Sequence, residues 1–251
     1  MICTRLLVLH SISSRTKFNC VYICHFKKEI ALGNFIYKLL CSNGEEILNP
    51  QIDGLEVEFK GTQGGLVEIE EGSVFHNTKI FIGSQGYVRI NKTHARGIRN
   101  TKIEMACAYK YKKLFIDEGC SIESARFSMV NDNNLSVTIG KNCMISSNIV
   151  FRGCDGHTIF DVNTGAVLNK SKPLIIGDHV WVGAETTFLK GCEIPNNTII
   201  GTGSILSRKY TEQFTVLAGR PASVVKTGVN WDRAHIPLFE KNREQLFPGN
   251  K

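Results

Sequence analysis

A six-residue repeat in the C-terminal half restricts the possible folds of this chain more than any other feature of its sequence. Large apolar residues recur there at every sixth position, as Ile176, Val182, Phe188, Ile194, Ile200 and Leu206. Small or β-branched residues stand four positions after the first five apolar residues, as Val180, Thr186, Cys192, Thr198 and Ser204. Glycine directly follows three of the apolar residues, as Gly177, Gly183 and Gly201. A period of six matches neither the periodicity of an α-helix nor one long strand. The repeat therefore predicts short strands separated by tight turns.

Hexapeptide repeats are typical of parallel β-helices, in which each repeat supplies one short strand and one corner. The apolar residue is expected to point into the coil, the small residue to sit at the tight turn, and glycine to let the backbone bend at low steric cost. Fainter copies keep this spacing upstream: Ile69 with Ser73 and Phe75, Ile116 with Cys120 and Ile122, and Ile139 with Cys143, Ile145 and Phe151. Insertions near residues 91–113 and 128–138 interrupt them. We therefore predict an all-β chain with a parallel β-helix over residues 66–226.

The two ends of the chain carry no such repeat. Residues 1–65 form an N-terminal segment of uncertain fold. Residues 227–251 are polar and mixed, with apolar residues spaced as in a short helix, namely Trp231, Leu238, Phe239, Leu246 and Phe247. Because the open end of a β-helix exposes strand edges, we expect this tail to form a helical cap. A length of 251 residues then corresponds to one large domain with two flanking segments.

Composition and charge exclude several classes of protein. With 42% hydrophobic and 21% charged residues, the chain is neither apolar enough for a membrane bundle nor polar enough for disorder. The apolar run Leu6–Leu9 is too short for a transmembrane helix and no cleavage site follows it, so a cytoplasmic location is expected. The formal net charge of +7 indicates an anionic partner. Nucleic acid is not favoured, because the basic residues are scattered and no reader motif is present.

The nine cysteines do not indicate a disulfide framework or a structural zinc site, since their number is odd and no C-x-x-C pair occurs. Cys20 and Cys24 with His25 lack a second matching pair, so no metal is expected. Three further cysteines fall on the small position of the repeat, namely Cys120, Cys143 and Cys192. We expect these three to be buried packing residues.

Residues 152–173 interrupt the repeat and are expected to leave the coil as an ejected loop. Long loops in an otherwise tight solenoid are usually functional or disordered. This loop carries His157, a side chain suited to proton exchange near neutral pH, with Asp155 and Asp161 close by in the sequence. A loop histidine near an aspartate is nevertheless more often a surface or structural residue than a catalyst.

Trp181 stands where the repeat resumes, one position before the inward-pointing Val182, so its side chain is expected to face outward. A large indole left in water has no structural use. We therefore expect Trp181 to form a subunit contact or part of a binding wall. His179 shares the outward orientation and is explained equally well as a polar face residue.

These motifs resemble those of the left-handed β-helix hexapeptide acyltransferases that use acetyl-CoA. The resemblance covers roughly residues 66–226 and is most specific in DGHTIFD from Asp155, IIGDHVWVGA from Ile175, IIGTGSIL from Ile199 and AGRPASVVK from Ala218. Within that family the chain is similar to bacterial O-acetyltransferases of capsular and other surface polysaccharides, including sialic-acid polymers. These share the DGH loop, the VWVG step and an NWDR-like tail, here Asn230–Arg233. The resemblance implies a left-handed coil and a homotrimer.

The resemblance also implies a mechanism. His157 would be the general base that takes the proton of a sugar hydroxyl while the hydroxyl attacks the thioester of acetyl-CoA, with a contribution on the order of 10²–10⁴ in rate. The absence of a G-x-S-x-G elbow favours direct transfer over a serine nucleophile. Asp155 and Asp161 are the candidates to orient His157. Trp181 matches the family's tryptophan at the acceptor and thioester end of the groove.

Five positions match the acetyl-CoA site of the family: Ala184, Thr202, Ser207, Arg208 and Lys226. Small residues would let the pantetheine arm lie along the coil, and Lys226 would meet the 3′-phosphoadenosine end. A solvated basic face explains Arg208 and Lys226 nearly as well. The implied acceptor is a sugar hydroxyl of a bacterial surface polysaccharide, with polysialic acid as one candidate. The expected location is the cytoplasm. A position at the inner face of the membrane, beside the capsule-synthesis machinery, remains an open alternative.

Three alternatives remain open from the sequence. An N-acetyltransferase of a nucleotide amino sugar would differ only in the acceptor. A γ-carbonic-anhydrase-like metalloenzyme would share the β-helix but needs three converging histidines, and His157 and His179 with His76 or His94 form no convincing set. A non-catalytic β-helix that binds a polysaccharide or a protein would have no need of the DGH loop.

Overall fold

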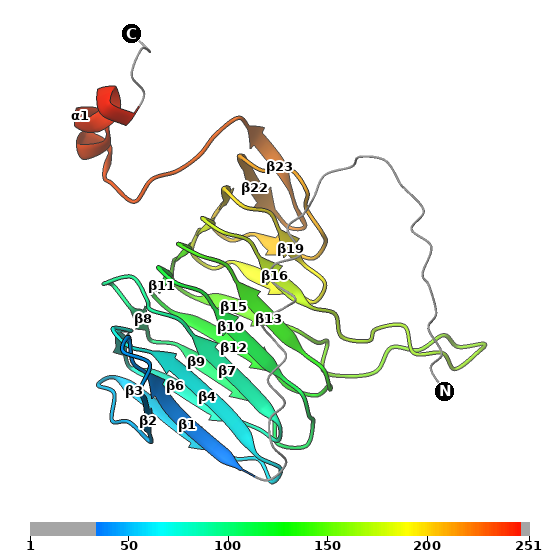
Figure 1. Cartoon of the computed structure of the whole chain (residues 1–251). Coiled ribbons are helices and arrows are strands. Elements are labelled where there is room, and N and C mark those ends of the chain that lie inside the picture. Colours follow the sequence, from blue (N-terminus) through cyan, green and yellow to red (C-terminus); the bar gives the residue numbers. More distant parts are fainter. Residues whose placement is uncertain (1–33, 247–251) are drawn as a thin grey trace, which may run out of the picture.

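The computed structural model describes residues 34–246, of which residues 35–227 wind into a parallel β-helix with three sides (Figure 1). Three sheets, named A, B and C, form these sides, and successive coils add strands to them in the order A, C, B. Within this region the named strands pair in parallel, except where β2 joins β1 and β23 joins β22. The predicted all-β class and parallel β-helix are confirmed.

The strands are short, as the repeat predicts. Sheet A holds β2 (Glu46–Leu48), β1 (Phe35–Leu40), β4 (Gly65–Glu70), β7 (Gly86–Ile90), β10 (Lys113–Ile116), β13 (Ser136–Ile139), β16 (Leu174–Ile176) and β19 (Glu193–Ile194). Sheet C holds β5 (Phe75–His76), β8 (Ile98–Arg99), β11 (Ser121–Ile122), β14 (Met144–Ile145), β17 (Trp181–Val182), β20 (Thr198–Ile200), β22 (Thr215–Gly219) and β23 (Ala222–Thr227). Sheet B holds β3 (Leu55–Phe59), β6 (Thr78–Ile82), β9 (Lys102–Met105), β12 (Ala125–Met129), β15 (Ile149–Arg152), β18 (Thr187–Leu189) and β21 (Ile205–Leu206).

Each hexapeptide occupies one side of the coil. The first three apolar residues lie on sheets A, C and B of one coil, and the next three pair with them on the coil above, as Ile176 with Ile194, Val182 with Ile200 and Phe188 with Leu206. All six are at most 3% exposed. Three repeats thus return the chain to the same side, and the apolar side chains stack in three inward columns.

Three phenylalanine rings stack in the inward column of sheet B. Phe151 lies between Phe127 and Phe188, at centroid distances of 4.4 and 4.9 Å and interplanar angles of 7° and 3°. All three rings are fully buried. Aromatic pairs of this kind add to the stability that burial of their surface provides.

The glycines after the apolar positions allow close packing of the coils. A Cβ on Gly183 would lie 2.6 Å from the backbone nitrogen of Thr202, and one on Gly177 would lie 2.8 Å from that of Asn196. The left-handed backbone conformation falls instead at neighbouring corner residues such as His179, with φ 54°. Room for the next coil, and not the expected bend, is therefore the reason for glycine at these positions.

The coil begins before residue 66. Strand β1 pairs in parallel with β4, and β3 pairs with β6, so the expected boundary at residue 65 falls inside the β-helix. In this first coil, residues 41–54 contain the hairpin strand β2 in place of a strand of sheet C, which removes the six-residue spacing. The remainder of the expected N-terminal segment, residues 1–33, lies outside the described residues.

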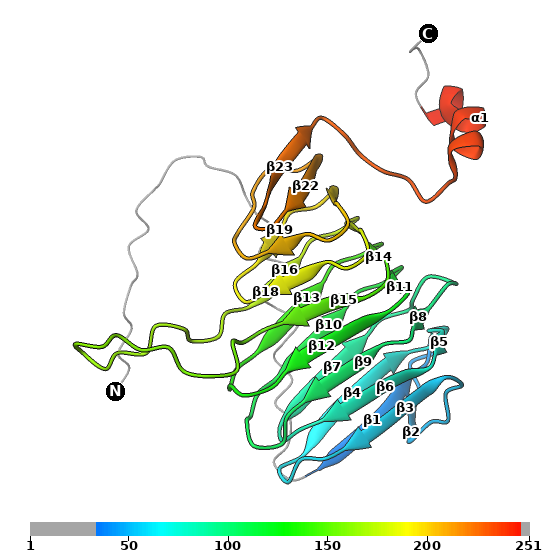
Figure 2. The ribbon, with the colours of Figure 1, turned by 180° about the vertical axis from the view of Figure 1, so that it is seen from behind.

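The last coil ends in the antiparallel hairpin of β22 and β23 on sheet C. The helix expected in the tail is present as α1 (Ile236–Leu246), but it lies to the side of the coil and not over its end, as Figure 1 and Figure 2 show. Its residues Ile236 and Leu238 are 75% and 51% exposed. The hairpin, and not the expected helical cap, therefore pairs with the last parallel strand of sheet C.

The three cysteines of the repeat are fully buried, so their prediction as packing residues is confirmed. The thiol of Cys120 donates to the carbonyl oxygen of Gly140 at 2.9 Å, and that of Cys143 to Gly177 at 3.2 Å. Burial raises the pKa of the Cys192 thiol. Cys20 and Cys24 lie outside the described residues. Within the described part of the chain, no helix has the length and apolar character needed to cross a bilayer.

Replacing the central ring of the stack should destabilise the fold strongly. We expect Phe151→Ala to lower the free energy of unfolding by about 3–5 kcal/mol, because it leaves a cavity between two rings that the coil holds apart. Arg126→Ala is the matched control, since Arg126 pairs across the strands with Val150 but faces outward in an exposed ion pair with Glu104. It should cost less than about 1 kcal/mol. Equal midpoints for both variants in denaturant unfolding would contradict the inward stack.

Candidate active site

The ejected loop leaves the coil after β15 on sheet B and returns at β16 on sheet A. It projects far from the body at the corner between these sheets (Figure 1, Figure 2). An antiparallel bridge joins Phe160 to Val167, so the outer part of the loop is a hairpin. The register of the core is unaffected, because Ile176 of β16 still pairs with Ile139 of β13. The sequence predicts that residues 152–173 leave the coil, and in the structure the outer part of this loop is a hairpin.

Asp161 holds the tip of this hairpin. Its carboxylate accepts hydrogen bonds from the backbone nitrogens of Asn163 at 2.9 Å and Thr164 at 2.8 Å, and from the Thr164 hydroxyl at 3.0 Å. These bonds, led by the one from the Thr164 backbone, lower the pKa of Asp161. The structure therefore places Asp161 as a turn cap, and its hydrogen bonds are directed to the turn and not to His157.

Asp155 ties the stem of the loop to the next coil. One of its carboxylate oxygens lies 2.6 Å from Nζ of Lys190 and 2.9 Å from Nδ2 of Asn169. The bond from Lys190, followed by that from Asn169, lowers the pKa of Asp155. The Lys190 ammonium also donates to the backbone carbonyl of Asn169 at 2.6 Å. Both strands of the stem are thus fastened to one cation.

The backbone of His157 is held by the same group of residues. Nδ2 of Asn169 donates to the His157 carbonyl oxygen at 2.7 Å, and Oδ1 of Asn169 accepts the backbone N–H of Ile159 at 2.8 Å. The imidazole is exposed, and within residues 34–246 its nitrogens have no hydrogen-bond partner. The coil therefore fixes the position of His157 through its backbone and leaves the ring available to a ligand.

Lys190 and Asn169 were not identified from the sequence. Lys190 is 35 residues from Asp155, and only the stacking of successive coils brings the two together. Lys190 follows β18, at the corner where the ejected loop leaves one coil below. A lysine at the same corner, one coil above a loop aspartate, is the signal that could have indicated this pair.

Trp181 lies on sheet C and faces outward, with 39% of its surface exposed. The loop with His157 leaves from the opposite corner, between sheets A and B. In Figure 2, the strands β14, β11 and β8 of sheet C lie on one side of the coil and the loop lies on the other. A single chain therefore does not bring Trp181 and His157 together.

A second tryptophan accompanies Trp181. The ring of Trp231, from the tail, lies 6.2 Å from that of Trp181 at an angle of 47°, and it stacks on His179 at 4.3 Å and 8°. Only 8% of Trp231 is exposed. The sequence indicates Trp231 as part of a cap, whereas the structure places it beside the outward face of β17.

The five positions expected to bind acetyl-CoA fall into three groups. Ala184 and Thr202 lie on successive coils at the corner between sheets C and B, where the N–H of Gly203 donates to the Ala184 carbonyl at 2.8 Å. Ser207 and Arg208 follow β21, at the corner from which the ejected loop leaves lower on the coil. Lys226 is exposed on β23 of sheet C. The structure therefore brings two pairs together but does not gather all five residues in one chain.

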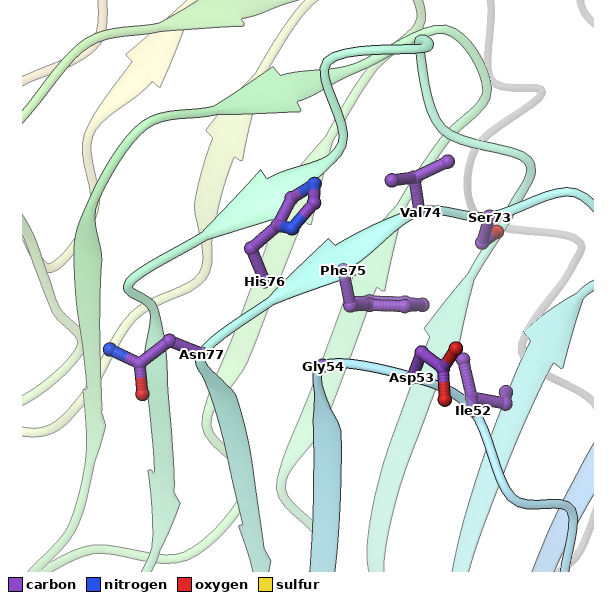
Figure 3. Close-up of a pocket in the computed structure, with 8 residues that line it drawn as sticks. All are labelled: Ile52, Asp53, Gly54, Ser73, Val74, Phe75, His76 and Asn77. Atoms are coloured by element: carbon purple, nitrogen blue, oxygen red, sulfur yellow. The ribbon is translucent and has the colours of Figure 1, made fainter.

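The described residues contain no cluster of histidine, cysteine, aspartate and glutamate that could hold a metal ion. His76 lies on β5, His179 at the corner before β17, and His157 in the loop, so they do not converge within one chain. His76 instead borders a shallow pocket of about 470 Å³ between residues 52–54 and β5, at the beginning of the coil (Figure 3). This pocket is several coils away from the loop.

Removing the Lys190 ammonium should loosen the loop. We expect Lys190→Met to increase cleavage of residues 155–169 by a protease about 3- to 10-fold at pH 7, because both strands of the stem lose their shared cation. The pKa of Asp155 is lowered, so in the wild type this ion pair should persist at neutral pH and be lost only as the pH falls through that lowered pKa. Lys141→Met, which removes an exposed pair with Glu118, is the control. Equal cleavage of all three proteins at pH 7 would exclude the proposed anchor.

No protein-family model matches the chain. It is 35% identical over 148 residues to a polysialic acid O-acetyltransferase of Escherichia coli O1:K1, which covers 59% of this chain and 45% of the relative. It is 40% identical over 106 residues to a polysialic acid O-acetyltransferase of Neisseria meningitidis, which covers 41% and 49%. The chain thus spans about half the length of the curated relatives that it matches.

Two solved structures share the fold. The polysialic-acid-specific acetyltransferase NeuO superposes with a TM-score of 0.58 and 22% identity, over 77% of this chain and 99% of that one. The polysialic acid O-acetyltransferase OatWY superposes with a TM-score of 0.50 and 23% identity, over 84% and 99%. The chain therefore has the left-handed β-helix fold of these enzymes, and the resemblance to the hexapeptide-repeat O-acetyltransferases that modify polysialic acid is confirmed.

Proposed function

We propose that this chain is an acetyl-CoA-dependent O-acetyltransferase that acts on a sugar hydroxyl of a bacterial surface polysaccharide. The observation that carries the proposal is the ejected hairpin, whose stem is fastened to the coil by Asp155, Asn169 and Lys190. It presents a His157 ring that has no hydrogen-bond partner among residues 34–246. Similarity to two polysialic acid O-acetyltransferases indicates the class of acceptor. A net charge of +7 suits a polyanionic acceptor of this kind.

His157 acts as the general base. A ring nitrogen takes the proton of the acceptor hydroxyl as its oxygen attacks the thioester carbon of acetyl-CoA. The tetrahedral intermediate then breaks its C–S bond, the acetyl group remains on the sugar, and the proton passes from the imidazole to the departing thiolate. Asp155 and Asp161 contribute by holding the stem and the tip of the loop, and not by contacting the ring. No metal takes part in this route.

The complete site forms between subunits of a homotrimer. One chain places His157 and Trp181 on opposite sides of the coil, so a second chain has to supply one of them. The loop also carries apolar side chains that the chain itself leaves exposed, at 47–85%: Ile159, Phe160, Val162, Val167 and Leu168. Side chains of this kind on a projecting hairpin favour burial against a neighbouring subunit.

Acetyl-CoA lies along the upper coils and contacts two subunits, because one chain does not gather the five expected positions. The exposed Thr202 and the corner residue Ala184 line one column where small side chains admit a pantetheine arm. Arg208 is fixed beside Tyr210, with its guanidinium donating to the carbonyl of Ala222 at 3.2 Å, and it can meet a phosphate together with Ser207. Lys226 is the further cation for the 3′-phosphoadenosine end. A reaction that consumes acetyl-CoA places the chain in the cytoplasm, next to the synthesis of the polysaccharide.

Removing the imidazole should abolish transfer without unfolding the protein. We expect His157→Ala to lower kcat by about 10²–10⁴, because a positioned general base contributes that much. The measurement is release of free CoA with polysialic acid as the acceptor. Thr158→Ala, an exposed neighbour in the loop, should retain wild-type turnover. Wild-type turnover in His157→Ala would remove the base from the mechanism.

Mixed trimers can test whether two subunits share one site. The variants His157→Ala and Trp181→Ala should each be inactive alone. When the two variants are mixed, unfolded and refolded together, the mixture should regain about a quarter of wild-type turnover. That fraction is expected because a quarter of the interfaces in a random trimer pair an intact His157 with an intact Trp181. Recovery close to zero, with trimers of normal mass, would contradict a shared site.

A further inference from the structure

One corner of the coil exposes a column of backbone carbonyl groups. Gly119, Asn142 and His179 occupy equivalent positions, each two residues before one of the paired residues Ser121, Met144 and Trp181. All three have a left-handed backbone conformation, with φ of 72°, 56° and 54°. Among residues 34–246, no backbone N–H donates to these three carbonyl groups, so they need donors from side chains.

Residues 229–235, which we call the strap, supply these donors. The indole N–H of Trp231 donates to the carbonyl of His179 at 2.9 Å. The guanidinium of Arg233 donates to Gly119 at 3.2 Å and to Asn142 at 3.5 Å, and it also reaches the carbonyl of Cys143 at 2.9 Å. A further guanidinium nitrogen donates to the hydroxyl of Ser121 at 2.9 Å. One arginine thus spans two coils, which the planar fork of its donors makes possible.

The strap places Trp231 against the outward tryptophan. Trp231 stacks on the His179 ring, which is itself held by Asn197 at 3.2 Å, and its own ring lies 6.2 Å from that of Trp181. Trp231 is 8% exposed and Trp181 is 39% exposed. One side of the Trp181 indole therefore has a neighbouring ring, and the exposed 39% of its surface is open to a ligand.

We propose that the strap is a positioning element that fixes the rotamer of Trp181 for the acceptor sugar. This inference rests on the proposed function, in which Trp181 lines the acceptor site. Trp231 is a positioning residue, because it is too buried to contact a sugar, and Arg233 acts through Trp231. Without the strap, the indole of Trp181 has to be ordered when the acceptor binds, which weakens acceptor binding and leaves the binding of acetyl-CoA unchanged.

The fluorescence of Trp181 tests the positioning without any activity. The chain has two tryptophans, so Trp231→Phe leaves Trp181 as the single reporter while it retains a ring in the strap. Adding Arg233→Ala should release the strap and raise the acrylamide quenching constant of Trp181 about twofold, with lower anisotropy. Lys241→Ala on the exposed face of α1 is the control in the same background. Unchanged quenching after Arg233→Ala, with an unchanged circular dichroism spectrum, would overturn the proposal.

Kinetics with polysialic acid as the acceptor then connect the strap to the reaction. Arg233→Ala in the otherwise wild-type chain should raise KM for the acceptor about tenfold and leave KM for acetyl-CoA within about twofold. Equal changes in both constants would contradict a role confined to the acceptor. If quenching responds but wild-type protein transfers no acetyl group, the proposed function fails and the positioning of Trp181 by the strap stands. If transfer occurs and neither quenching nor KM responds, only the strap proposal fails.

Discussion

The parallel stacking of one coil on the next is the interaction on which the rest of this structure depends. Strands about 4.8 Å apart leave little space between coils, so glycine is needed where backbones meet, as at Gly183 over Thr202. The same stacking aligns the inward side chains in columns, of which the phenylalanine stack is one. Extra residues can leave such a coil only outward and only at a corner, because a strand that lost its register would turn its apolar side chains to water.

Both candidate functional elements are chain segments outside the coil that are fastened to it by polar contacts. The ejected loop is held at its stem by the pair of Asp155 and Lys190. The strap is held by Arg233 on the corner carbonyl groups of Gly119 and Asn142. In each case a regular scaffold supplies the fixed partner and an irregular segment supplies the reactive or aromatic side chain. This division explains how a protein with short strands can hold His157 through its loop, while Trp231 of the strap lies beside Trp181 of β17.

The sequence predicts the inward columns well, because a period of six is local and each repeat carries the same steric demand. It predicts the ejected loop for the same reason, since an insertion interrupts that period. It misses the first coil, where β2 replaces a strand of sheet C, and it misses the contacts of Lys190 and Trp231. Those contacts join residues 35 and 52 positions apart, and insertions of unequal length hide which corners lie together. Only the stacked coils show them.

The proposed activity of this β-helix is the transfer of acetyl groups to a polysaccharide hydroxyl. The most direct measurement is incubation of the wild-type protein with acetyl-CoA and polysialic acid, followed by nuclear magnetic resonance of the recovered polymer. We predict new O-acetyl signals on the sugar that rise in step with free CoA. A polymer without O-acetyl signals, from a protein that still binds acetyl-CoA, would contradict this choice of acceptor. Absence of any CoA release with polysialic acid, other capsular polysaccharides and nucleotide sugars would contradict acetyl transfer itself.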